Sequence, residues 1–242
     1  RDSTLWAGPE KSDSPATANL SADSHVARYN GRMLSLDRQN HWREVYAAAH
    51  PGWRPATERF AALVRAARPP GTRLLDLGCG CGVPVARRLA RRHPLTGVDI
   101  SPVQIERARQ NVPTAHFLCA DMATLDLAPQ SLAAVVSFYT IIHLPLDEQP
   151  ALLRNIGRWL QPGGYLMATV GHSAWTGQED GWLGGGNAMY WSHAGEDTYL
   201  AWLAAAGLTV LWTRFVPEGV AGHTLILAQK VESTAEAQRT QR

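Results

Sequence analysis

The middle of the chain alternates between short apolar runs and longer stretches in which apolar residues recur at helical spacing. Runs of about five apolar residues are typical of buried strands, and the spaced pattern is typical of amphipathic helices. Strands that alternate with helices form a parallel sheet with helices on both faces, so the pattern predicts an α/β domain. The expected strands are 73–77, 95–99, 115–119, 133–138 and 165–170, and the expected helices lie near 83–92, 102–111 and 147–160.

The two ends of the chain differ from this middle part. Residues 1–35 show no periodic pattern, and their first part is rich in Ser, Ala, Asp and Pro, which is typical of a flexible segment. Residues 36–70 predict two helices that either pack on the sheet or form a lid over the site. Residues 231–242 are expected to be a polar tail. We therefore expect a single domain over residues 36–230.

Residues 172–195 contain many glycines and aromatic residues but no clear period. A disordered loop does not usually carry so much apolar area, so this segment either has a small core of its own or walls an apolar acceptor site. The run Gly184–Gly186 is typical of a hinge in a lid that excludes water. A helix near 196–206 and two strands at 208–215 and 223–229 are expected to follow.

Three alternating glycines, Gly78, Gly80 and Gly82, follow the first expected strand, and Asp76 precedes them. Residues without Cβ let the backbone turn sharply and approach a ligand closely. The spacing does not fit the dinucleotide fingerprint, which needs a small residue three positions after its second glycine. The sequence also has no phosphate-binding G-x-x-x-x-G-K-[ST] loop. A second acid, Asp99, ends the next strand, where it can bind ribose hydroxyls.

The pattern D-x-G-x-G-x-G resembles motif I of the class I S-adenosylmethionine (SAM) methyltransferases, and the resemblance covers about residues 72–230. It implies a Rossmann-like, mostly parallel sheet of seven strands flanked by helices, in the order 3-2-1-4-5-7-6 with the last strand antiparallel. It also implies SAM as cofactor. The glycine loop and Asp76 would hold its methionine part, Asp99 its ribose and Asp121 its adenine amine. Ala120 and Met122 would supply a backbone N–H and an apolar wall, and Ile100 would pack on adenine. The implied cofactor site comprises Asp76, Gly78, Cys79, Gly80, Asp99, Ile100, Gln104, Ala120, Asp121, Met122, Ser137 and Tyr139.

The acceptor side is predicted from residues near the expected active edge. Methyl transfer from a sulfonium needs alignment of the acceptor, and an acceptor with a bound proton also benefits from a general base. Histidine suits that role near neutral pH. The candidate bases are His143, His193 and His223, each of which has a purely structural alternative. The candidate acceptor contacts are Trp42, Tyr46, Tyr139, His172, Trp182, Tyr190 and Trp191.

Charge and composition narrow the partners. The net charge of +2 provides no strong field for nucleic acid, and four arginines within 87–92 are expected to form a solvated helix face. Three cysteines are too few for a disulfide framework, and their spacing does not fit a zinc site, so we expect reduced thiols and no metal. No apolar run reaches the length of a membrane span. We expect a cytoplasmic monomer or homodimer without membrane contact.

The resulting hypothesis is methyl transfer from SAM to an O, N, S or C nucleophile of a small apolar or aromatic metabolite, in secondary metabolism. Two alternatives stay open: an RNA or protein methyltransferase, and a SAM-binding protein without transferase activity. Intact glycines and acids indicate binding competence only, and fold-level likeness does not fix a function.

Overall fold

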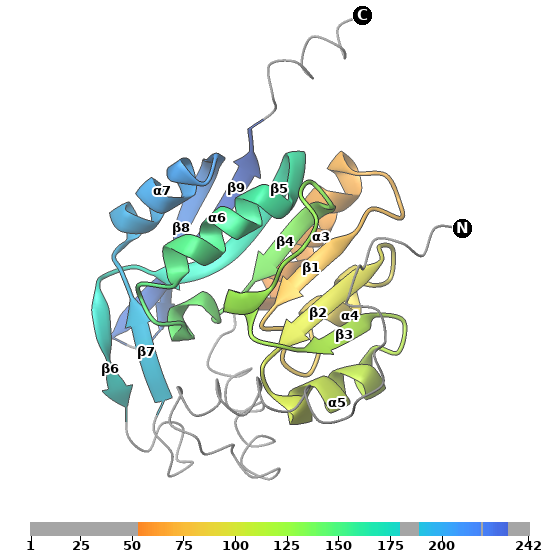
Figure 1. Cartoon of the computed structure of the whole chain (residues 1–242), viewed down its shortest axis with the longest axis horizontal. Helices are drawn as coiled ribbons and strands as arrows, with labels where there is room; N and C mark the ends of the chain where they lie inside the picture. The colour runs from red at the N-terminus through yellow and green to blue at the C-terminus, as the bar shows by residue number, and fades with distance from the viewer. Residues whose placement is uncertain (1–52, 180–188, 219, 232–242) are drawn as a thin grey trace, which may run out of the picture.

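The computed structural model describes residues 53–179, 189–218 and 220–231 (Figure 1). Seven strands form the main sheet in the order β3-β2-β1-β4-β5-β9-β8. β9 is antiparallel to both of its neighbours, and the pairs β2–β3, β1–β2, β1–β4 and β4–β5 are parallel. Since β9 is the seventh strand of this sheet along the chain and β8 the sixth, the expected order 3-2-1-4-5-7-6 is confirmed. The strands are β1 (Leu74–Leu77), β2 (Leu95–Asp99), β3 (His116–Cys119), β4 (Leu132–Ser137), β5 (Leu160–Gly171), β8 (Leu208–Glu218) and β9 (Ala221–Lys230).

Helices cover both faces of this sheet, as the alternating pattern predicts. Helices α3 (Trp53–Ala67), α4 (Val85–Leu89) and α5 (Pro102–Asn111) contribute to one apolar cluster, together with Met167, Leu225 and Leu227 of the sheet. Helices α6 (Gln149–Trp159) and α7 (Glu196–Ala205) pack on the other face (Figure 1). The expected helix between 36 and 50 lies outside the described residues. Among the residues that the structure describes, no helix is long and apolar enough to span a membrane.

The start of α5 shows how local chemistry positions the site. The Ser101 hydroxyl accepts a hydrogen bond from the Gln104 backbone N–H at 3.3 Å, and Pro102 occupies the first turn. A full capping box would also bring the Gln104 side chain back to the Ser101 N–H. The sequence Ser101-Pro102-Val103-Gln104 is typical of such a box, but its second bond does not form, because the Ser101 N–H donates to Asp99 Oδ1 at 2.9 Å instead. The Gln104 side chain is therefore not used to cap the helix.

The segment 172–195, whose sequence shows no clear period, contains regular structure. It contains a two-stranded antiparallel sheet of β6 (Trp175–Glu179) and β7 (Met189–His193). The buried Gln149 amide holds this hairpin to α6, since its Nε2 donates to the carbonyl oxygens of Leu144 at 2.8 Å and Ser192 at 2.5 Å. The Tyr199 hydroxyl donates to Gln149 Oε1 at 2.5 Å. The predicted hinge Gly184–Gly186 lies outside the described residues.

The connection 216–222 also differs from the seven-residue loop suggested by its sequence. β8 continues to Glu218 and β9 begins at Ala221, and these two residues are register partners. The strands are therefore joined by a tight hairpin turn. Two short 3₁₀ helices complete the edge of the sheet: η1 (Met122–Thr124) after β3 and η2 (Ile141–His143) after β4.

Candidate active site

The glycine loop after β1 is tied to the neighbouring strand and leaves one side open. The backbone N–H groups of Gly78 and Cys79 both donate to the Val98 carbonyl, at 2.7 and 3.0 Å. Gly78 has φ +73°, and a Cβ there would overlap the Thr140 side chain. Gly80 has φ +52°, and a Cβ there would meet no atom within 4 Å. The backbone at Gly80 therefore faces open space at the carboxyl ends of the parallel strands, where ligands of open α/β sheets bind.

Two acids lie beside this loop. The Gly80 N–H donates to Asp99 Oδ2 at 2.9 Å, which joins the loop to the end of β2. Asp76 is 3% exposed, and its Oδ2 has no hydrogen-bond partner among the described residues. Burial, together with the nearby Asp99 carboxylate, raises the pKa of Asp76 from 3.8 to about 8. Burial also raises the pKa of Asp99, although its bonds from Ser101 and Gly80 oppose that shift.

This pair of acids fits a ligand that carries a positive charge. A buried carboxyl group without a partner costs free energy, and a second acid beside it adds repulsion when both are ionised. An ammonium group can donate to the unpartnered Asp76 oxygen and relieve that repulsion. SAM has such a group on its methionine part and ribose hydroxyls within the same molecule. The residues present therefore fit the cofactor that motif I implies.

Two further buried polar atoms lack a partner among the described residues. The Ser137 hydroxyl at the end of β4 is fully buried, and the Gln104 Oε1 lies at the start of α5. Buried polar groups are usually paired, so unpartnered atoms at one sheet edge indicate sites where a ligand group completes the pairing. Both residues are in the set predicted from the sequence.

The expected adenine site is only partly as anticipated. The Ala120 N–H donates to the Asp99 carbonyl at 3.0 Å, so it is not available to a base. The expectation that Ala120 offers this donor is therefore wrong, because β3 uses it to extend its pairing with β2. The Asp121 carboxylate caps η1 by accepting from the Ala123 N–H at 2.9 Å. Ile100 and Met122 are partly buried, and Cys79 is a buried thiol whose pKa is raised by burial.

The three candidate histidines meet at the ends of β4, β5 and β9. The rings of His193 and His223 are 5.8 Å apart between centroids, and Tyr139 stands edge-on to His223 at 5.4 Å. Trp191 links the third histidine, since its ring is 4.5 Å from His143 and 6.1 Å from His223. Tyr139 holds a left-handed backbone with φ +54°, and its pKa is raised by burial and by the neighbouring Glu218. We name these five side chains, Tyr139, His143, Trp191, His193 and His223, the aromatic cluster.

Each histidine of the aromatic cluster has an acceptor at Nδ1. His143 Nδ1 lies 2.9 Å from the Tyr190 carbonyl and His193 Nδ1 2.7 Å from the Ser173 carbonyl. Both bonds assign the proton of the neutral ring to Nδ1 and leave Nε2 as an acceptor. Burial lowers the pKa of His143 to about 4 and also lowers the pKa of His193. Both rings are therefore neutral near pH 7.

His223 differs because its Nδ1 partner is a carboxylate. Glu218 Oε2 lies 2.9 Å from His223 Nδ1, and both side chains are largely buried. A carboxylate at Nδ1 orients the ring and stabilises the imidazolium that forms when Nε2 takes a proton. Glu218 is not among the predicted site residues, because the sequence around it predicts a loop. The feature that identifies it is its position across a tight turn from His223, which is known only once the register of the hairpin is known.

Other predicted acceptor contacts lie elsewhere. His172 Nδ1 is 3.0 Å from Thr224 Oγ1 and 3.1 Å from Glu196 Oε2. Since Thr224 and His223 are neighbours on β9, their side chains point to opposite faces of the sheet, and His172 is not part of the aromatic cluster. Tyr190 contributes its carbonyl to His143. Trp42, Tyr46 and Trp182 lie outside the described residues.

Comparisons with known proteins agree with this geometry. A family model described as a methyltransferase domain matches residues 74–164. An uncharacterized methyltransferase of Mycobacterium bovis is 40% identical over 119 residues, which are 48% of this chain and 59% of that protein. Carboxy-S-adenosyl-L-methionine synthase of Actinobacillus succinogenes is 32% identical over 127 residues, 48% of this chain and 52% of that protein. The chain thus spans about half the length of the curated relatives it matches.

The same fold occurs in a solved structure with the cofactor bound. Magnesium protoporphyrin IX methyltransferase from Synechocystis, determined with SAM, superposes with a TM-score of 0.63 at 18% identity. The match covers 88% of this chain and 99% of that one. At this identity the likeness establishes the fold, while the glycine loop, the two acids and the matched domain establish the cofactor. Residues 74–164 match a methyltransferase domain, and the chain is similar in fold and in its glycine loop to the class I S-adenosylmethionine-dependent methyltransferases.

Proposed function

We propose that the protein transfers a methyl group from SAM to an O, N, S or C nucleophile of a small apolar or aromatic metabolite, in secondary metabolism. The observation that carries the proposal is the juxtaposition of two features at one sheet edge. The unpartnered Asp76 carboxyl and the open side of the glycine loop follow β1, and the aromatic cluster gathers where β4, β5 and β9 meet. We also propose that residues 36–230 act as one domain in the cytoplasm, as a monomer or homodimer.

The chain's own groups would bind and orient the cofactor. Asp76 would accept from the ammonium group of the methionine part, and the free lone pairs of the Asp99 carboxylate would accept from the ribose hydroxyls. The left-handed backbone at Gly80 keeps side-chain atoms out of the cofactor's path. Asp121 and Met122 would lie at the base. The bound cofactor supplies an electrophilic methyl group on a sulfonium, and the protein's contribution is alignment of the acceptor with it.

The acceptor would lie against the aromatic cluster. Apolar walls from Trp191 and Tyr139 exclude water and favour a flat or apolar molecule. For an acceptor with an O–H, N–H or S–H, the proton would go to His223 Nε2 as the nucleophile attacks. The Glu218 carboxylate would then stabilise the resulting imidazolium through the Nδ1–H bond. His143 and His193 would serve as neutral hydrogen-bonding groups, because burial disfavours their charged forms.

Two alternatives make different predictions. An RNA or protein methyltransferase would bind bulk RNA or peptide with a strong dependence on salt, whereas the net charge of +2 favours a neutral or small partner. A protein that binds SAM without methyl transfer would keep cofactor affinity and yield no product. The similarity to carboxy-S-adenosyl-L-methionine synthase illustrates that related sequences occur in proteins named for a different activity.

The test is a product search with the purified full chain. SAM carrying a deuterated methyl group is incubated with a panel of phenols, amines, thiols and aromatic acids, and products are detected by mass spectrometry. We expect a product that carries the labelled methyl group with wild-type protein. His223→Gln should lower its yield without loss of S-adenosylhomocysteine binding. Cofactor binding without a labelled product on any panel or cell extract would favour the binding protein instead.

A further inference from the structure

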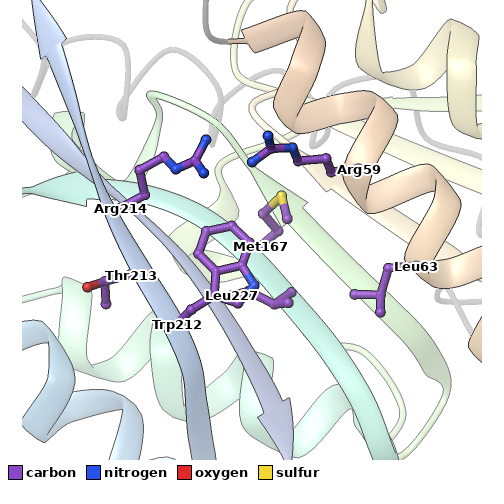
Figure 2. A pocket seen from close by; sticks show the side chains of 7 residues that line it. All are labelled: Arg59, Leu63, Met167, Trp212, Thr213, Arg214 and Leu227. Atoms are coloured by element: carbon purple, nitrogen blue, oxygen red, sulfur yellow. The ribbon is translucent and has the colours of Figure 1, made fainter.

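A cavity of about 370 Å³ lies between α3 and the strands β5, β9 and β8 (Figure 2). Its apolar lining includes the buried side chains of Met167 and Leu227 and the partly buried ring of Trp212. Two arginines complete it. Figure 2 shows Arg59 from α3 and Arg214 from β8 reaching over the cavity from opposite sides, with their guanidinium groups turned toward each other.

No acidic residue lines the described part of the cavity, and no hydrogen bond or ion pair joins Arg59 or Arg214 to a described residue. The partly buried Arg88 of α4 does have such a partner, in Glu58 at 2.8 Å. Two like charges that face each other repel, and an anion between them turns the repulsion into attraction.

The chemistry of the lining defines the ligand. Guanidinium groups bind carboxylate and phosphate oxygens in a two-pronged geometry, which an ammonium group cannot reproduce. The tryptophan ring and the apolar floor below them suit an aromatic or other flat hydrocarbon body. The cavity therefore suits a molecule that is anionic at one end and apolar in the rest.

The register of β8 and β9 connects this cavity to the aromatic cluster. Arg214 pairs with Leu225 and Val216 with His223. Alternate residues share a face of a sheet, so Arg214 and Glu218 of β8 lie on the same face as Leu225 and His223 of β9. Two residues along a strand span about 7 Å, which is the scale of one or two fused rings. A ligand with its anion between the arginines can extend toward His223.

We propose that the methyl acceptor is an apolar or aromatic molecule with an anionic group, and that Arg59 and Arg214 bind that group. This inference rests on the proposed function, because it assigns the cavity to the acceptor. It makes Arg59 and Arg214 residues that determine specificity, remote from the reacting atoms. Carboxylate and phosphate share the chemistry described, and the experiment separates them.

The experiment measures binding by calorimetry to the full chain saturated with S-adenosylhomocysteine. The probes are naphthoate, naphthyl phosphate and the neutral naphthamide. We expect the tighter-binding of the two anions to bind about tenfold more tightly than the amide, because an anion pairs with the arginines and the neutral amide does not. The double variant Arg59→Met, Arg214→Met should remove that preference, whereas the control Arg65→Met on the exposed surface of α3 should keep it. Stronger binding of the phosphate would assign the site to phosphate monoesters.

The outcomes separate this inference from the proposed function. Equal affinity for naphthoate, naphthyl phosphate and naphthamide would overturn the anionic acceptor, as would a preference that survives the double variant. Absence of binding by either anion would also overturn the anionic acceptor. An acidic segment of the same chain that filled the cavity would give this result. If the wild-type protein did not bind S-adenosylhomocysteine, the proposed function itself would be contradicted. Unchanged cofactor affinity in the double variant shows that the variant is folded.

Discussion

Replacing Asp76 by asparagine removes the ionisable group beside the glycine loop while keeping its size and shape. The Asp76 pKa of about 8 means that about nine tenths of the cofactor-free protein carries a proton on this carboxyl at pH 7. An ammonium ligand needs the ionised form, so its binding should release about 0.9 proton per molecule at pH 7. The apparent affinity should rise about tenfold between pH 6 and pH 7.

The asparagine variant should lose this linkage. Without the carboxylate, the charge-assisted bond to the ammonium is lost, which weakens SAM binding by roughly 1.5–3 kcal/mol at pH 7. Proton release at Asp76 should disappear, and affinity should vary little between pH 6 and pH 7. Calorimetry in buffers of different ionisation enthalpy measures both quantities in one series. Equal affinity and equal proton release in the variant and the wild type would refute the cation-binding role of Asp76.

The cofactor-free variant should also be more stable than the wild type at alkaline pH. The folded-state pKa of Asp76 lies above the ordinary value of 3.8, so the folded state holds a proton that the unfolded state has released. The free energy of unfolding of the wild type should therefore fall as pH rises from about 4 toward 8, with an upper limit of about 6 kcal/mol for this group. Thermal melts at pH 5 and pH 8 should show a smaller loss in Asp76→Asn.

Five other substitutions test the rest of the site and the packing beside it. Once an acceptor is known, Glu218→Gln should lower turnover by about 10-fold to 100-fold and His223→Gln by about 100-fold to 10,000-fold, with unchanged SAM affinity. Near-normal turnover of both variants at pH 6 to 9 would mean that alignment of the acceptor alone suffices for catalysis. Gly80→Ala should cost about 1 kcal/mol of stability yet weaken cofactor binding strongly, whereas Gly78→Ala should impair folding through its clash; similar melting temperatures for the two would contradict the steric reading. Gln149→Met should lower the free energy of unfolding by about 1–3 kcal/mol, because two buried carbonyls and a hydroxyl lose their hydrogen-bond partner. Denaturant titrations measure this change, and an unchanged midpoint of unfolding would show that water replaces the amide.

Local sequence signals are sufficient to predict the strands and helices that carry the cofactor site. The strand 95–99 and the helix 102–111 have the predicted bounds, because an apolar run, a capping serine and a first-turn proline all act within a few residues. The strand order was correct only through the family resemblance, since periodicity does not determine which strands are neighbours. The proximity of Asp76 and Asp99 follows from that order and from parallel pairing.

Long-range packing decided what the sequence did not reveal. The hairpin of β6 and β7 has no strict alternation, and its position depends on the buried Gln149 amide from a distant helix. Glu218 became a partner of His223 only because the turn is shorter than its glycines suggested. The meeting of Arg59 with Arg214 depends on how α3 packs over β8, and nothing in the spacing of either residue indicates it.

The internal position of β9, between β5 and β8, has a consequence for synthesis of the chain. β9 is the last of the described strands to be made, yet it inserts beside β5, from Tyr165 opposite Gln229 to Gly171 opposite His223. A growing chain that has passed η2 already contains both acids and the glycine loop, whose partners are close in sequence. Until residues 221–230 emerge, β5 has an unpaired edge, which is prone to pair with other chains. Translation arrest or truncation between η2 and β9 would yield a chain that has the glycine loop and both acids but lacks His223. The unpaired edge of β5 would make that chain prone to aggregation.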